Sequence, residues 1–208
     1  KKADNYASFV KQRIAENGRA PDIVKSPIRA WVDNVKEINS EKNDMAPSIS
    51  TDGSEIIFSS NRPNGKSQDE VGDFDFDIYS SSFYDGSWKA PKPVKGAVNS
   101  ESDDVSNNLS FDGTKMLFHR TIEGNSDIYE TELMGANWSK PSKLYHNISS
   151  KKYDEKYGAY SADRSKLYYS RNVRSGNGYN VVFSGVQDRV RNEYGVAAQI
   201  PPFNSKFD

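Results

Sequence analysis

The sequence predicts an all-β fold, a partial β-propeller of about three four-stranded blades with a short N-terminal helix. The first observation is a block that recurs along the chain, with copies starting at residues 38, 98 and 148. The second is that each block contains several short apolar segments separated by turn residues. The third is the composition of the 208 residues, of which only 35% are hydrophobic but 12% are aromatic. That composition suits many half-buried strands.

Each block opens with a polar segment that ends in an acidic residue. These segments occupy residues 38–44, 98–104 and 148–154, and a fourth copy opens at residue 203. Their recurrent residues are Asn39, Asp44, Asn99, Asp104 and Asp154. An acid–base pair needs two carboxyl groups with different pKa values, whereas here the same residue types recur in every block. We therefore predict a structural task, in which these side chains cap the loop before the first strand.

The strands of each block follow in a fixed order. Asp52-Gly53 and Asp112-Gly113 predict tight turns, because glycine accepts the positive φ that such turns need. Apolar segments then predict second strands at residues 56–58, 116–118 and 167–169, and third strands at 77–79, 127–129 and 180–183. Trp88 and Trp138 mark turns that lead to a fourth, outer strand. The third block departs from this pattern, with Asp163-Arg164 at its turn and no tryptophan.

The chain before the first block is predicted to be separate, with a helical segment and linker over residues 1–27. Apolar residues between 4 and 17 are spaced as one helical stripe, which Gly18 and Pro21 end. Residues 28–208 form the incomplete propeller, with blades at about 38–97, 98–147 and 148–203. We expect residues 28–36 to be a strand that completes a neighbouring blade. Because rings have four to eight blades, we also expect further blades or a partner.

These motifs carry a resemblance to a known family. The order Asn-Ser-x-x-x-Asp, Ser-x-Asp-Gly, Asp-Ile-Tyr and Gly-x-Trp-x-x-Pro is similar to the PD40 (WD40-like) repeats of TolB-type propellers. It most resembles repeats in Bacteroidetes envelope proteins that carry tetratricopeptide repeats before the propeller and an OmpA-like domain after it. That group includes components of the type IX secretion machinery. The resemblance covers about residues 36–208 and implies a periplasmic, outer-membrane-associated scaffold that binds other envelope proteins.

Several classes of function are disfavoured by the composition. The net charge is −1, so long-range attraction to nucleic acid is weak. Apolar runs are far too short to insert into a bilayer. The chain has no cysteine, which excludes disulfides, thiolate metal sites and cysteine nucleophiles. We expect no cofactor and no metal, and we interpret His119 and His146 as ordinary blade residues.

Two sets of charged residues are candidates for contacts with a partner. Arg62, Arg120 and Arg171 follow the second strands, where they either pair with the repeated aspartates or face an acidic partner. The first block is lengthened by an acidic segment that contains Asp69, Glu70, Asp73 and Asp75. In this segment Asp73, Asp75 and Asp77 alternate and could offer oxygens to Ca²⁺. A solvated loop and a protein contact are the other two interpretations.

The sequence therefore favours a non-catalytic binding module that uses its loop-bearing end and blade edges to hold other envelope proteins, or missing blades and domains of the same protein. The alternative is a carbohydrate-binding or glycoside-hydrolysing propeller, in which carboxylates near the axis would act as acid and base. That alternative needs exposed aromatic residues for stacking on sugar rings. Trp88 and Trp138, however, are predicted at the opposite end of the blades.

Overall fold

The computed structural model describes residues 10–11, 13–14, 17–18, 21–22, 24–25, 31–63, 74–144, 147–173, 179–188 and 193–200. It divides into one compact unit built on residues 1–34 and another built on residues 35–206. In the first unit, the described residues between 10 and 25 are helical and exposed. No helix in the described part of the chain is long and apolar enough to cross a membrane.

Two predictions for the first unit need correction. The helix was expected to end at Asn17, but Pro21, Asp22, Val24 and Lys25 are helical as well. The strand predicted over residues 28–36 is absent from its described part. Residues 31–35 pair with no described strand, and residues 36–38 form a turn.

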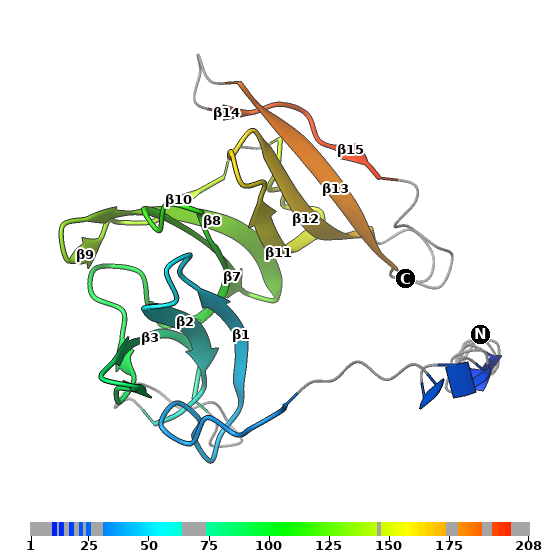
Figure 1. Ribbon diagram of the computed structural model, residues 1–208. Helices are drawn as coiled ribbons and strands as arrows, with labels where there is room; N and C mark the ends of the chain where they lie inside the picture. Colours follow the sequence, from blue (N-terminus) through cyan, green and yellow to red (C-terminus); the bar gives the residue numbers. More distant parts are fainter. Residues whose placement is uncertain are drawn as a thin grey trace. The chain divides into compact units, whose positions relative to one another are not determined.

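The second unit contains three antiparallel sheets that follow one another along the chain (Figure 1). Blade 1 consists of β1 (Asp44–Ile49), β2 (Glu55–Ser60), β3 (Asp77–Tyr84), β4 (Ser87–Trp88) and β5 (Lys92–Pro93). Blade 2 consists of β6 (Asp103–Leu109), β7 (Lys115–Ile122), β8 (Asn125–Met134), β9 (Asn137–Trp138) and β10 (Ser142–Lys143). Blade 3 consists of β11 (Asp154–Tyr160), β12 (Lys166–Val173), β13 (Tyr179–Asp188), β14 (Glu193–Tyr194) and β15 (Ala198–Gln199).

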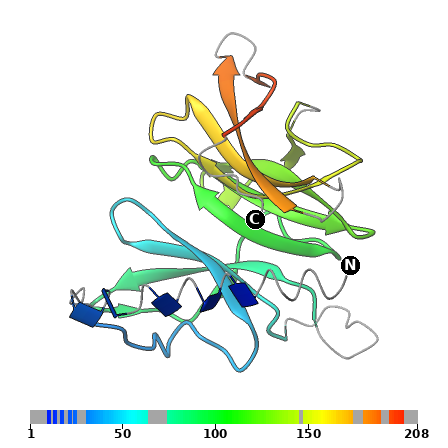
Figure 2. The same cartoon turned by 90° about the vertical axis from the view of Figure 1, so that its right-hand side faces the viewer.

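All three sheets have the same topology. The first three strands form a meander, and two short segments pair side by side with the third strand, so that the predicted fourth strand is split in two. The sheets stack face to face (Figure 2). The first strands contact one another, β1 with β6 and β6 with β11, and therefore lie on the inner side of the stack. This arrangement confirms the predicted all-β, partial propeller of three four-stranded blades.

The first turn of each blade has the same geometry in all three copies. The amides of Gly53, Gly113 and Arg164 each donate to the serine carbonyl three residues earlier. All three residues have positive φ, at 72°, 68° and 57° respectively. Arg164 therefore occupies the left-handed region that glycine fills in the other blades. The departure of the third block from Asp-Gly leaves the turn unchanged.

A bulge interrupts the first strand of every blade. The pairing register shifts between Met45 and Ser48 in β1, between Ser106 and Asn108 in β6, and between Lys156 and Ala159 in β11. Bulges bend a strand and increase its twist. Here they occur in the strands that lie closest together, where three sheets must converge.

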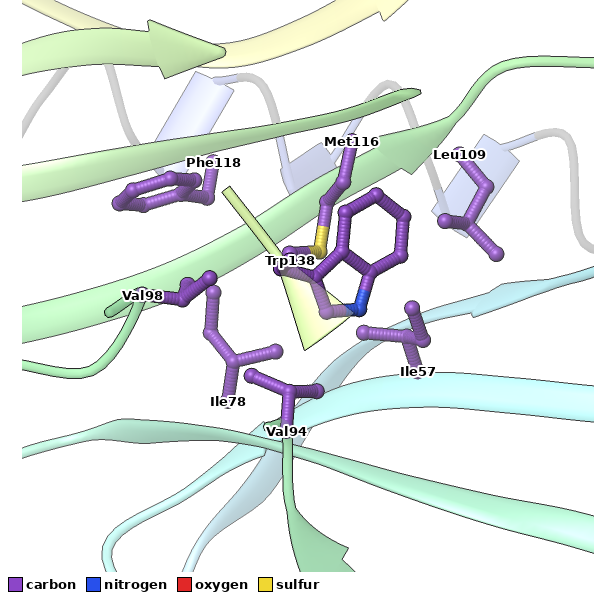
Figure 3. Close-up of a cluster of buried hydrophobic side chains, with 8 residues drawn as sticks. All are labelled: Ile57, Ile78, Val94, Val98, Leu109, Met116, Phe118 and Trp138. Carbon is purple, nitrogen blue, oxygen red and sulfur yellow. The ribbon is translucent and has the colours of Figure 1, made fainter. Parts of the chain in front are cut away.

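Two of the three apolar clusters lie between successive blades, whereas the third, formed by Ile38, Ile56, Phe58 and Tyr79, belongs to blade 1 and the turn before it. Figure 3 shows the cluster between blades 1 and 2, where Ile57, Ile78 and Val94 meet Met116 and Trp138 across the gap. A second cluster between blades 2 and 3 contains Leu117, Ile128, Leu144, Ile148, Leu167, Tyr169 and Tyr194. Full burial of such a side chain contributes about 1.5–3 kcal/mol. Packing between successive blades therefore stabilises the stack.

Candidate functional site

The candidate site lies at the end of the blades where the first strands begin and the second strands finish. At this end a carboxylate, an arginine and a serine meet in every blade, an arrangement that we call the carboxylate–arginine knot. The three knots are Asp44, Arg62 and Ser40; Asp104, Arg120 and Ser100; and Glu155, Arg171 and Ser150. Each knot fastens the loop before a first strand to the adjacent second strand.

The knot of blade 2 shows the full set of bonds. Arg120 donates from Nε to Oδ1 of Asp104 at 2.6 Å and from Nη2 to the carbonyl of Val98 at 2.5 Å. Ser100 donates to Oδ2 of Asp104 from its amide at 2.7 Å and from its hydroxyl at 2.8 Å. Asp104 is completely buried. Both carboxylate oxygens are thus used within the blade.

In blade 1 the arginine of the knot does not occupy the sheet position that Arg120 occupies in blade 2. Arg62 Nη2 donates to Asp44 Oδ1 and to the carbonyl of Ile38, both at 2.7 Å. Asp44 pairs with Ser60 in the sheet, whereas Asp104 pairs directly with Arg120. The guanidinium of blade 1 therefore belongs to Arg62, which is two positions after Ser60 and beyond the end of β2.

In blade 3 the knot contains Glu155, not the predicted Asp154. Arg171 Nε donates to Glu155 Oε1 at 2.8 Å, and the Ser150 amide donates to Glu155 Oε2 at 3.0 Å. Glu155 pairs with Arg171 in the sheet, as Asp104 does with Arg120. The motif spacing aligned Asp154 with Asp104. In the structure, the carboxylate of the knot belongs instead to the next residue, Glu155, whose side chain is longer than that of aspartate.

Asp154 has a different task, which is to link blades. Its Oδ1 accepts from the Ser126 amide at 3.2 Å and from Asn125 Nδ2 at 3.3 Å, both in blade 2. Asp103 does the same one blade earlier, accepting from the Phe76 amide at 3.0 Å.

The two predicted asparagines of the repeat have different surroundings. Asn99 also joins blade 2 to blade 1, since its side chain accepts from the Ile78 amide at 2.8 Å and donates to the Ile78 carbonyl at 2.9 Å. Asn39, its counterpart before blade 1, is exposed.

Each knot arginine also lies against aromatic rings. The guanidinium carbon of Arg62 is 4.9 Å from the centre of the Tyr79 ring, and that of Arg120 is 5.1 Å from the centre of the Tyr129 ring. Arg171 lies 5.5 Å from the centre of the Tyr169 ring. Cation–π contacts of this kind add to the ion pairs. Of the two roles considered for these arginines, their contacts show pairing inside the blade, and contact with a partner stays a prediction.

The surroundings of the three carboxylates shift their pKa values differently. Burial raises the pKa of Glu155 to about 7, against the Ser150 amide and Arg171, which favour the charged form. Burial also raises the pKa of Asp104, despite its bonds to Arg120 and Ser100. Burial acts in the same direction on Asp44, but there the hydrogen bonds from Ser60, Ser40 and Arg62 outweigh it and lower the pKa.

The acidic segment of blade 1 is only partly described. Asp69, Glu70 and Asp73 lie outside the described residues. Asp75 is half-buried, and Asp77 is the first residue of β3, where it is buried and pairs with Ser60. Asp77 therefore belongs to the sheet. In the described residues, no three acidic, histidine or cysteine side chains gather as metal ligands would.

His119 is buried in the junction between blades 2 and 3. Asn107 accepts the Gly158 amide at 3.2 Å through Oδ1, so its Nδ2 is the group that donates to His119 Nδ1 at 2.9 Å. The imidazole ring packs edge-on against Tyr157, at 5.4 Å between ring centres. Burial, helped by the charge of Lys156, lowers the pKa of His119 to about 3. His119 is thus a neutral residue of the blade junction, and His146 lies outside the described residues.

Comparison with known proteins finds distant structural likenesses. No family model matches the sequence, and no curated protein matches it. TolB from Acinetobacter baumannii is similar in structure, with 15% identity over 77% of this chain and 33% of that one, and a TM-score of 0.48. A putative TolB from Agrobacterium tumefaciens has 17% identity over 77% of this chain and 46% of that one, with a TM-score of 0.48.

An α-L-arabinofuranosidase from Lactobacillus brevis also resembles the chain, with 15% identity over 76% of this chain and 54% of that one, and a TM-score of 0.43. The chain spans between a third and about half of the length of these three structures. Its fold is established by its own sheet order. Three consecutive four-stranded meanders, stacked face to face and each containing an equivalent knot, form a partial β-propeller.

Proposed function

We propose that this chain is a non-catalytic scaffold module that binds other proteins in the bacterial periplasm. One observation carries the proposal: the recurrent carboxylates and arginines, which are the groups best suited to chemistry, hold each other inside the blades. Asp104 and Glu155 have no exposed surface, and each is bonded to an arginine of its own blade. A substrate has no access to either carboxylate in this arrangement.

The same bonds support a binding role. They fasten the loops at residues 38–44, 98–104 and 148–154 to the sheets, so that the loop-bearing end is held in one conformation. A surface that is already ordered loses less conformational entropy when a partner binds. A rigid end with knotted loops therefore suits a scaffold.

The finer assignment rests on the resemblance of the repeats. The segments around Asn99-Ser100 and Asp112-Gly113 are similar to the PD40 repeats of envelope proteins that are attached to the outer membrane. We therefore propose an outer-membrane-associated module, within a type IX secretion or peptidoglycan-linked complex. Its partners would be other envelope proteins and further blades of the same kind.

Trp88 and Trp138, the tryptophans of the blades, weigh against the alternative of a carbohydrate-active propeller, whereas Trp31, which is 98% exposed, belongs to the first unit. Trp138 is only 7% exposed and belongs to the core between blades 1 and 2. Trp88 is half-buried and packs edge-on against Phe83, at 5.2 Å between ring centres. Neither ring presents the free face that stacking on a sugar requires.

The test is cross-linking of the tagged, full-length protein in intact envelopes, followed by identification of what it captures. We expect the same proteins to be captured in every replicate, and neither sugar binding on a glycan array nor turnover in a glycosidase panel. Sugar turnover that is lost in Asp104→Asn, in a variant shown to be folded, would contradict the proposal. The absence of any captured protein would contradict it as well.

A further inference from the structure

A groove runs between the outer part of blade 1 and the β8–β9 hairpin of blade 2, and it encloses about 520 Å³. One side carries Lys89, Lys92 and Lys95, and the other carries Leu133 and the backbone of the hairpin. Val94 and Trp138 also line the groove. We call it the lysine groove. Figure 3 shows Val94 and Trp138 approaching each other from the two blades, in the core on which the groove rests.

The lysine groove has an excess of positive charge. Lys89, Lys92 and Lys95 are all exposed, and within the described residues no carboxylate forms an ion pair with any of them. Lys89 lies over the Tyr84 ring, at 5.5 Å from its centre. Glu55 is the one acidic residue of the lining, and the hydrogen bond that stabilises its charged form comes from Ser80. Lys89 Nζ also donates to Ser87 Oγ at 3.2 Å, but no carboxylate of the described residues neutralises the three ammonium groups, so an anionic partner can pair with them.

The equivalent groove between blades 2 and 3 shows that this excess is specific to one position. It also contains three lysines, Lys115, Lys140 and Lys143. There, Lys115 pairs with Glu130 at 2.7 Å and Lys143 pairs with Asp127 at 2.6 Å. The groove between blades 2 and 3 is therefore largely neutral, whereas the lysine groove between blades 1 and 2 keeps its positive charge.

The lining of the lysine groove is apolar as well as charged. Leu133 is 37% exposed, and Val94, Pro93 and Ala136 also line the groove. A polyanion recognised by charge alone would make no use of these groups. A peptide that brings carboxylates to the lysines and one apolar side chain to Leu133 would satisfy both parts of the surface.

We propose that the lysine groove binds an acidic protein segment that carries an apolar anchor residue. This inference rests on the proposed scaffold function, for which it names the class of partner. The net charge of the whole chain is −1, so a nucleic acid or an anionic membrane gains little from long-range attraction. A short acidic peptide meets only the local field of the three lysines, which falls off within about 8–10 Å at physiological salt.

The test uses a fluorescein-labelled peptide of about nine residues, roughly 30 Å when extended, with aspartates around a central leucine. Its binding to the full chain is followed by fluorescence anisotropy. We expect saturable binding that weakens as salt is raised. Lys92→Glu and Lys95→Glu should each weaken it about tenfold, because each reverses one charge, a change of two charge units beside the bound carboxylates. Replacement of the leucine by alanine in the peptide should weaken binding as well.

Lys140→Glu is the matched control, because it makes the same change of charge at an exposed lysine of the neutralised groove. It should leave the affinity within about twofold of the parent value. Exposed substitutions of this kind change stability by only about 0.5 kcal/mol, so all three variants should fold. Three results would overturn the inference: no binding of the acidic peptide, equal weakening by Lys140→Glu, or equal binding of a single-stranded oligonucleotide or phosphatidylglycerol vesicles.

The failure of this inference can be separated from the failure of the scaffold function by repeating the envelope cross-linking with Lys92→Glu. If the same proteins are captured and the peptide is not bound, the scaffold function stands and the groove is not its site. If nothing is captured even by the parent protein, the scaffold function itself is wrong.

Discussion

Glu155 accepts the Nε hydrogen of Arg171 at 2.8 Å, and it does so from the position that Asp104 occupies relative to Arg120 in the preceding blade. The carboxylate–arginine pair therefore recurs at the same place in the sheet, although the acidic residue type and its spacing in the motif differ between the two blades. Glu155 has no exposed surface, and 15% of the Arg171 side chain is exposed. Removing one partner would leave a buried charge without its counter-ion, which is costly.

The first prediction distinguishes the two neighbouring acids of blade 3. Glu155→Ala should lower the free energy of unfolding by about 3–5 kcal/mol, because it removes the carboxylate that faces the largely buried guanidinium of Arg171. Asp154→Ala removes hydrogen bonds of 3.2 and 3.3 Å to blade 2 and should cost about 1 kcal/mol. Urea unfolding of both variants measures the difference. Equal losses would mean that the two residues have been assigned the wrong roles.

The second prediction concerns Gly96, which has a φ of +113° and forms a bridge with Trp138 of blade 2. A Cβ at this position would lie 2.1 Å from the Trp138 carbonyl oxygen. Gly96→Ala should therefore push the two blades apart and cost at least about 2–3 kcal/mol in the free energy of unfolding.

Gly86→Ala is the control for Gly96→Ala, because it also has positive φ but nothing within 4 Å of the added Cβ. It should cost only the backbone strain, about 1–2 kcal/mol. A Gly96 variant no less stable than the Gly86 variant would show that the close approach to Trp138 is not needed.

The third prediction concerns the dependence of stability on pH. His119 has a pKa of about 3 in the folded chain and an ordinary value of 6.5. Below pH 6.5 the unfolded chain binds a proton that the folded chain does not, so this contribution to stability is lost as the pH falls. From about pH 7 to pH 5 the loss is about 2 kcal/mol.

His119→Gln keeps an acceptor for Asn107 but has no group that titrates. We expect the stability of the parent relative to this variant to fall by about 2 kcal/mol from about pH 7 to pH 5, as measured by urea unfolding at each pH. Glu155 is present in both proteins, so its own titration cancels in the comparison. Parallel stability curves would indicate that His119 is accessible to protons in the folded chain.

The fold was predictable because the repeat is carried by local signals. Asp52-Gly53 and Asp112-Gly113 specify turns, and the short apolar segments after them specify strands. Arg164 has positive φ without being glycine, a geometry that the sequence left undefined. The split of the outer strand was also missed, since Lys92 and Pro93 carry no signal that separates them from Trp88.

The candidate site was less predictable, because it depends on register. Asp154 and Glu155 are adjacent acids, and the loop before β11 is one residue longer than the loop before β6: Ser150 and Glu155 are 5 residues apart, whereas Ser100 and Asp104 are 4 apart. The pairing of Glu155 with Arg171 emerges only from the sheet. The lysine groove was missed altogether, since Lys92 and Leu133 are distant in sequence and come together only where two blades meet.

The most direct test of the claim that the recurrent charges pair with each other inside the blades is a double-mutant cycle on Asp104 and Arg120. The free energy of unfolding is measured for Asp104→Ala, Arg120→Ala and the double variant. We predict that each single change costs about 3–5 kcal/mol and that the double change costs less than their sum by about 2–3 kcal/mol. Costs that add to within about 0.5 kcal/mol would contradict the account, because they would show that the two residues act independently.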